Sequence, residues 1–313
     1  MTNQKIGKDF WLYIGGYILL LLLAIFVPLL QLIVLFLLPL PVIFLVVQYD
    51  KKLASIGLGF LVLLSLFLYP IIAFPLTFLA MISGIMIGFS LKKKQHAYET
   101  WAKGSAGYLI GFAFIYVFVE TVLNFSIQDS FIQTMDESLA MTEELFLSVG
   151  IDYFSDDDLK ILREQMMQML QLLPVILVVI SMVLSFFTQW LSYKWWNKFM
   201  DQSLYFPPFR QFQLPKIMLW IYLIILLLSF IGIGEKGDYI SIAIFNISHL
   251  LGVLLMLQGL SFIFYYSYVK KGSKALPIIS ILIIVFFPII GLYLARILGI
   301  IDLGFELKKR ITK

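Results

Sequence analysis

The sequence predicts an all-α fold, a polytopic membrane helix bundle of about nine spans, and three observations lead to this fold class. Hydrophobic residues make up 61% of the 313 positions and charged residues only 13%, whereas about a quarter of a soluble chain is charged. The apolar residues form runs close to the ~20 residues that a spanning helix needs. Lysine and arginine gather between alternate pairs of these runs, as they do in multi-pass proteins.

Six spans are predicted before residue 194, near 10–27, 30–48, 53–69, 71–91, 104–124 and 173–193. The first follows Lys5 and Lys8 and is not followed by a small-residue cleavage site, so we interpret it as an uncleaved span rather than a signal peptide. The second contains "LPLP" at 38–41, which predicts a bent or re-entrant segment whose freed backbone groups are satisfied by neighbours or water.

Glycine pairs indicate which helices pack closely. Gly84 and Gly88 lie four residues apart in the fourth span, and Gly107 and Gly111 do so in the fifth. Because small residues at this spacing let two backbones approach each other, we expect tight packing of the fourth and fifth helices.

Three further spans are predicted near 216–233, 240–268 and 275–300. Nine spans from a cytoplasmic start place the basic tail "ELKKRITK" outside, against the preference of basic residues for the cytoplasm. The alternative is that Pro288 divides 275–301 into two half-helices that enter the membrane and return. We retain nine spans as the prediction, because the segment is short for two crossings.

Charge distribution predicts the orientation and the location in the cell membrane. The positive-inside rule places the N-terminus, Lys92 to Lys103 and the loop 194–216 in the cytoplasm. The acidic loop 126–172 then lies outside the cell. This gives three regions: membrane helices 1–5 in 1–125, an extracytoplasmic acidic helical hairpin in 126–172, and membrane helices 6–9 in 173–313.

The hairpin is predicted from helical spacing of apolar residues over 127–150, with acidic residues on the other face. Gly150 suits a helix C-terminus, and Ser155 caps a second helix whose first turn holds three aspartates. Adjacent carboxylates also suggest calcium, but the glycine and bidentate glutamate of a calcium loop are missing. The hairpin is expected to pack over the outer mouth of the bundle or to act as a lid or docking surface.

Polar residues within the spans are the candidate ligand-binding residues. Such residues are costly in lipid and usually face the bundle or a cavity. By the predicted orientation, five of them lie in the outer half of the membrane and are expected to line a pocket that opens outward: Gln31, Glu120, Asn124, Asn246 and His249. The competing interpretation is simple hydrogen bonding between helices. Gln258 is expected to bond a neighbouring backbone instead.

The cytoplasmic loop 194–216 alternates aromatic with basic residues. Between two spans, this composition suits the lipid headgroup layer rather than nucleic acid. We expect it to contact a membrane or cytoplasmic protein partner through Trp195, Trp196, Phe209 and Arg210.

Other classes of function find no support in the sequence. There is no cysteine and there are only two histidines, so no thiolate or histidine-rich metal site is expected. No phosphate-binding glycine loop or catalytic motif occurs. We therefore expect no catalytic residue, no metal and no cofactor, and we predict that the protein is not an enzyme.

Four segments resemble the YybS family of bacterial integral membrane proteins, a family of unknown function: "LPLPVIF", "FRQFQLPK", "QGLSFIFYY" and "LGIIDLGFELKKR". The resemblance implies a core of six helices similar to the substrate-binding S components of energy-coupling-factor transporters and to the shape protein MreD. The first span departs from the S components, which carry an alanine at every fourth position, because it has Gly15, Gly16 and Ala24.

Two functions follow from these observations. The first is a transport-type, S-component-like protein that binds a small polar solute from outside the cell. The alternative is a non-transporting scaffold or regulator that binds protein partners through the outer hairpin and the inner loop. A core filled by side chains, with no cavity, favours the second, and an ordered non-lipid molecule beside Glu120 favours the first.

Overall fold

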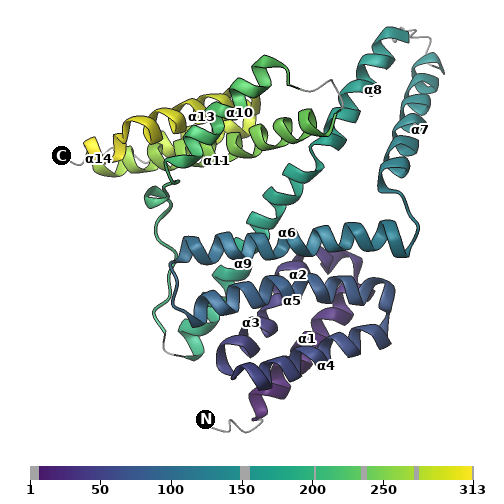
Figure 1. Cartoon of the computed structure of the whole chain (residues 1–313), viewed down its shortest axis with the longest axis vertical. Coiled ribbons are helices and arrows are strands. Elements are labelled where there is room, and N and C mark those ends of the chain that lie inside the picture. The colour runs from purple at the N-terminus through teal and green to yellow at the C-terminus, as the bar shows by residue number, and fades with distance from the viewer. Residues whose placement is uncertain (1–6, 149–155, 201, 234–237, 271–274, 312–313) are drawn as a thin grey trace. The chain divides into compact units, whose positions relative to one another are not determined.

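The structure is a computed structural model of the chain that describes residues 7–148, 156–200, 202–233, 238–270 and 275–311 (Figure 1). Every regular element within these ranges is a helix, which confirms the all-α class. The chain divides into two compact units, unit 1 (Met1–Tyr205) and unit 2 (Phe206–Lys313). Gly150 and Ser155, the predicted stop and cap in the hairpin, lie outside the described residues.

Unit 1 holds nine of the α-helices: α1 (Lys8–Phe26), α2 (Gln31–Leu37), α3 (Pro39–Gln48), α4 (Lys51–Leu68), α5 (Pro70–Lys92), α6 (Ala97–Val122), α7 (Ile127–Ser148), α8 (Asp156–Gln171) and α9 (Leu173–Phe199). Unit 2 holds α10 (Ile217–Ile231), α11 (Tyr239–Val269), α12 (Ala275–Phe286), α13 (Pro288–Phe305) and α14 (Leu307–Ile311). Short 3-10 turns occur at Pro28–Leu30 and Phe209–Gln211.

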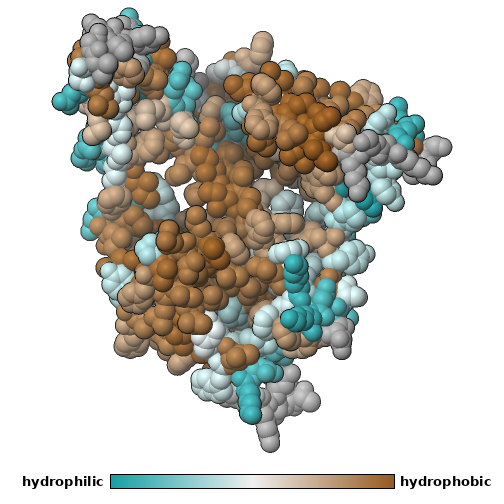
Figure 2. All heavy atoms as spheres, turned by 180° about the vertical axis from the view of Figure 1, so that it is seen from behind, coloured by the Kyte–Doolittle hydropathy of each residue, from teal (hydrophilic) through white to brown (hydrophobic). Residues whose placement is uncertain are grey.

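Eight helical segments in the described ranges have the length and the apolar composition of a membrane span, and two shorter apolar helices, α10 and α12, accompany them. Figure 2 shows apolar residues over much of the visible surface, with hydrophilic residues in small groups. Since an exposed apolar surface of this kind is stable only against lipid, the helices form a polytopic membrane bundle.

The second predicted span is broken between α2 and α3. Pro39 lacks the N–H that would bond the carbonyl of Leu35 four residues earlier. The hydroxyl of Thr188 on α9 instead donates to the carbonyl of Phe36 at 2.8 Å. The hydroxyl of Tyr108 on α6 lies 3.2 Å from the Leu35 oxygen and 2.6 Å from the Thr188 hydroxyl. The expectation that neighbouring groups satisfy the broken backbone is confirmed.

Glycines bring α5 and α6 together as predicted. A Cβ atom on Gly107 would lie 2.7 Å from the Cα of Ser83, and one on Gly111 would lie 2.7 Å from the Cα of Leu79. Gly84 and Gly88 face α3 instead, where an added Cβ would come within 2.7 to 2.9 Å of Val42 and Val46. Helix α5, the fourth predicted span, therefore packs its glycines against α3, the second half of the broken span. Helix α6 supplies the glycines for the α5–α6 contact.

Helices α7 and α8 form the predicted hairpin, in which Arg163 bonds Asp136 at 2.9 Å. The backbone remains helical through Leu172, whose N–H bonds the carbonyl of Gln168 at 3.2 Å. As expected, α8 therefore leads almost directly into α9, and Pro174 lies in the first turn of α9.

Unit 2 is built on two helices, α11 and α13, that run in the same direction. Gly252 packs against Arg296, Leu255 against Gly299, and the Gln258 side chain bonds Asp302 at 2.5 Å. Residue numbers rise together on both helices, so the pair is parallel. Backbone contact is close, because an added Cβ on Gly259 would lie 1.9 Å from the carbonyl oxygen of Ala295.

The prediction of one last span over 275–300 is wrong. Two helices, α12 and α13, occupy this region and are separated at Phe287, just before Pro288. Because α13 is parallel to α11, the intervening α12 must carry the chain back in the opposite direction. The two-helix alternative is the one that the structure contains, and it returns the basic tail to the side on which α11 ends.

Candidate functional site

A cavity of about 310 Å³ lies in unit 1 beside α2, the first half of the broken span. Helices α1, α2, α5 and α6 line it. One lining residue, Gln31, has a polar side chain, and the others are apolar: Ala24, Leu35, Ile71, Ile72, Pro75, Leu76, Ile115, Phe118, Val119 and Leu123. Gln31 is exposed at the start of α2, and its backbone N–H bonds the carbonyl of Pro28, whereas its side-chain amide makes no hydrogen bond with a described residue. Its amide can therefore serve a molecule that enters the cavity.

Glu120 and Asn124 lie next to this cavity in sequence but shape a turn. The Glu120 carboxylate accepts a hydrogen bond from the backbone N–H of Ile127 at 3.1 Å, at the start of α7, where a negative charge suits the helix dipole. Asn124 adopts a left-handed conformation with φ of 49°. Val119 and Leu123, their neighbours in sequence, line the cavity. The two polar residues thus position the cavity wall without being part of the lining itself.

Asn246 and His249 lie in unit 2 and bond their own helix. The Asn246 amide donates to the carbonyl of Ile242 at 2.9 Å, and His249 Nδ1 donates to the carbonyl of Phe245 at 2.8 Å. Three of the five predicted ligand-binding residues belong to unit 1 and these two belong to unit 2. Only Gln31 lines a described cavity, so the role of the other four in binding stays a prediction.

Arg296 is a further candidate functional residue that is absent from the five predicted ligand-binding residues. It lies midway along α13, and its guanidinium packs on Gly252, where an added Cβ would be 2.7 Å from Cζ. Its Nε atom is buried without a hydrogen-bond partner, and Arg296 forms no ion pair with a described residue. A charged residue in the middle of an apolar helix is costly and is usually retained for function. The position of a charged residue in the middle of an apolar segment is the sequence feature that could have identified it.

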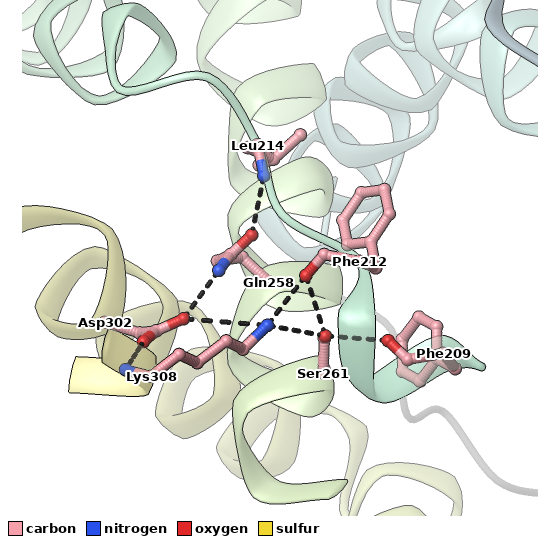
Figure 3. Close-up of polar contacts among 7 residues, drawn as sticks. All are labelled: Phe209, Phe212, Leu214, Gln258, Ser261, Asp302 and Lys308. Carbon is pink, nitrogen blue, oxygen red and sulfur yellow. Dashed lines mark hydrogen bonds and ion pairs between the residues drawn. The ribbon is translucent and has the colours of Figure 1, made fainter. Parts of the chain in front are cut away.

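A group of buried polar contacts in unit 2 joins α11, α13, α14 and the segment 206–216 (Figure 3). Gln258 accepts a hydrogen bond from the backbone N–H of Leu214 at 2.8 Å and donates to Asp302. The other Asp302 oxygen accepts from the backbone N–H of Lys308 at 3.1 Å. The prediction that Gln258 bonds a neighbouring backbone is confirmed.

Lys308 and Ser261 complete this network. The Lys308 ammonium donates to the carbonyl of Phe212 and to the Ser261 hydroxyl, both at 2.7 Å, and lies 3.9 Å from the Asp302 carboxylate (Figure 3). The Ser261 hydroxyl lies within 2.9 Å of the carbonyls of Phe209 and Phe212. Burial lowers the pKa of Lys308 to about 8, although Asp302 acts in the opposite direction. Such a satisfied network stabilises one arrangement of the chain.

A second contact ties the same parts together outside the network. Lys216 forms an ion pair with Glu306, and hydrogen bonds from Lys216 and then Lys309 hold the pKa of Glu306 below its usual range. The tail after α13 is therefore attached to the segment before α10, and both lie at the same end of unit 2.

The four residues predicted to contact a partner differ in exposure. Trp196 is 5% exposed and packs perpendicular to Phe44, and its contact with a partner stays a prediction. Trp195 stacks on Phe44 and is 36% exposed. Phe209 is 37% exposed, and Arg210 lies 3.8 Å above the ring of Tyr268. The aromatic residues in the last turns of α9 and in the segment after it thus pack between elements, because their large apolar rings are more stable when buried.

Comparison with known proteins now adds the family. Residues 17–303 match the family described as "Predicted membrane protein (DUF2232)". The chain belongs to this family. It is also 28% identical over 302 residues to "Uncharacterized protein YybS" of Bacillus subtilis (strain 168), a match that covers 95% of this chain and 96% of that relative. No solved structure matches the chain.

Membership in the DUF2232 family confirms the resemblance to YybS and the assignment as a multi-pass membrane protein. The family description states a membrane location and no activity. The expected likeness of unit 1 to transporter S components therefore stays an expectation.

Proposed function

We propose that the chain is a transport-type membrane protein that binds a small amphipathic molecule in the cavity beside α2. The cavity of about 310 Å³, with the Gln31 amide in an otherwise apolar lining, is the observation that supports this. Pockets of this size, mostly apolar with few polar groups, are typical of small-molecule sites. The solute class changes from polar, as predicted, to a largely apolar molecule with one hydrogen-bonding group.

The broken second span supports the same location. Discontinuous helices in membrane proteins are tolerated where they are buried in protein or line a cavity, and transporters bind substrates beside such breaks. Here Leu35 lines the cavity, and its carbonyl oxygen meets the Tyr108 hydroxyl. The described lining contains no acid, base or nucleophile, so the proposed activity is binding without catalysis.

Native mass spectrometry of the gently purified protein tests the proposal. We expect a bound molecule on the wild-type chain, and an about fivefold weaker occupancy in Gln31→Leu, since one hydrogen bond contributes ~1 kcal/mol. Filling the cavity with Ile115→Trp should abolish the adduct, whereas Ile110→Trp on the same helix, at an exposed position outside the lining, should not. Equal occupancy in all four proteins would overturn the proposal.

A second candidate, the scaffold, has support from the hairpin α7–α8. Apolar side chains are exposed on it, among them Met141 (66%), Leu145 (61%) and Met169 (65%). Outside a membrane, exposed apolar groups that lie together mark contact sites. Site-specific crosslinking from Leu145 in cells tests this candidate, and a protein adduct that persists when the cavity is filled by Ile115→Trp would favour it over solute binding.

A further inference from the structure

A second cavity in unit 1, of about 620 Å³, lies where α3, α5 and α9 end. Its lining is more polar than that of the first cavity and includes Lys92, Lys94, Tyr193, Trp196, Gln202 and Ser203. Helix ends in a membrane bundle lie at the level of the lipid headgroups. None of the described lining residues is acidic, and Asp201 lies outside the described part of the chain.

The two lysines bring positive charge that the described lining does not balance. The Lys92 ammonium donates to the carbonyls of Val46 at 3.0 Å and Tyr49 at 2.6 Å, which fixes its position at the end of α3 while leaving it one further proton to donate. Lys94 is exposed and forms no ion pair with a described residue. Lys103, by comparison, is paired with Glu99 at 2.7 Å. The cavity thus has an ordered cation and a second cation beside it.

Trp196 gives an independent sign of a missing partner. The side chain lines the cavity and is 5% exposed, yet its indole N–H has no hydrogen-bond partner. A buried donor without a partner costs about 1–3 kcal/mol, and buried indole N–H groups usually find an acceptor. Its Nε1 atom has almost no accessible surface, so a small turn of the indole toward the cavity would let a bound acceptor satisfy it.

We propose that this cavity binds a phosphate group, carried by an anionic phospholipid headgroup or supplied as free phosphate. Lys92 and Lys94 supply the positive charge, and the Trp196 indole and the Ser203 hydroxyl supply neutral donors. This site is distinct from the cavity beside α2 and does not depend on the proposed transport function.

The full chain purified in detergent is the protein to test. Its melting temperature is measured against rising phosphatidylglycerol, phosphatidylcholine or inorganic phosphate. We expect phosphatidylglycerol or inorganic phosphate to stabilise the wild type. If inorganic phosphate raises the melting temperature, free phosphate is sufficient for binding. If phosphatidylglycerol raises it and inorganic phosphate does not, the ligand is the lipid headgroup. Either outcome supports a phosphate-binding site. Protection by neither, or equal protection by phosphatidylcholine, overturns the proposal.

Two variants and a matched control locate the effect. Lys94→Gln should raise the half-saturating concentration about fivefold, since one lysine near the membrane surface contributes about 1 kcal/mol to binding an anion. Lys93→Gln removes the same charge from the adjacent exposed lysine, which is outside the lining, and should leave binding unchanged. Trp196→Phe keeps an aromatic ring without the N–H and should also weaken binding. An equal effect of Lys93→Gln and Lys94→Gln would show unspecific attraction instead.

Discussion

Charged residues on and just after α13 differ in whether their side chains have hydrogen-bond partners. Asp302 is 2% exposed and Lys308 7% exposed, and each has hydrogen bonds to Gln258, Ser261 or the backbone. Arg296, six residues before Asp302 on the same helix, has none with a described residue. Buried charges are stable when paired and hydrogen-bonded, so loss of the charge at Asp302 and loss of the charge at Arg296 should have opposite effects on stability.

We expect Asp302→Ala to lower the free energy of unfolding by about 3 kcal/mol, because it leaves the Lys308 charge buried without its partner. The double variant Asp302→Leu with Lys308→Met should recover much of this loss, since it removes both charges. Thermal unfolding in detergent measures both. Lys103→Met, which breaks the exposed pair with Glu99, is the control and should change stability by less than about 1 kcal/mol. A double variant as unstable as the single one would show that hydrogen bonding, rather than charge, dominates.

Arg296→Met is expected to raise the free energy of unfolding by about 1–3 kcal/mol, because it removes an unpaired charge from the middle of an apolar helix. Arg296→Lys keeps the charge and should bring no gain. Thermal unfolding again supplies the measurement. A loss of stability in Arg296→Met would mean that the guanidinium has a counter-charge beyond α11 and α13.

At the scale of elements, helix pairs are fixed by small residues at their crossings. Gly259 and Gly299 bring the backbones of α11 and α13 together, and Gly107 and Gly111 do the same for α6 against α5. In lipid there is little hydrophobic force between helices, so close van der Waals packing decides which helices associate. A glycine such as Gly16, whose added Cβ would contact no atom within 4 Å, therefore does not hold two helices together.

Gly259→Ala should lower the free energy of unfolding by about 1–3 kcal/mol, since its Cβ would overlap the Ala295 carbonyl and force α11 from α13. Gly16→Ala in α1 is the matched control: no atom lies within 4 Å of its added Cβ, and alanine favours a helix over glycine by about 0.5–1 kcal/mol. The control should therefore be neutral or more stable. Denaturation in detergent measures the free energy of unfolding of both variants. An equal change in Gly259→Ala and Gly16→Ala would contradict the packing argument.

At the scale of the whole molecule, the course of the chain through the membrane follows from the parallel pair α11 and α13. The contacts of Lys308 with Phe212 and of Lys216 with Glu306 place the tail on the side of segment 206–216. The acidic hairpin, one span earlier than that segment, should lie on the opposite side. By the positive-inside rule, we predict a cytoplasmic tail and an extracytoplasmic hairpin.

Cysteine labelling tests this course directly, because the natural chain has no cysteine. Single substitutions Gln213→Cys and Lys309→Cys should react with a membrane-impermeant maleimide only in opened cells, and Glu144→Cys should react in intact cells. Labelling of Lys309→Cys in intact cells would contradict the two-helix return of α12 and α13. Labelling of Gln213→Cys and Lys309→Cys in intact cells, with Glu144→Cys protected, would reverse the orientation.

The membrane class, nearly all spans, the hairpin at α7–α8 and the backbone bond of Gln258 could be predicted from the amino-acid sequence, because apolar run length and helical spacing are local properties of the chain. The packing of distant helices was needed to show that Tyr108 and Thr188 satisfy the break at Pro39 and that Asp302 meets Lys308 beside Phe212. It was also needed to show that Gln31 lines a cavity while Asn246 and His249 bond their own helix. Each of these depends on which face of one helix meets another far away in sequence, and hydrophobicity in lipid is nearly the same on every face.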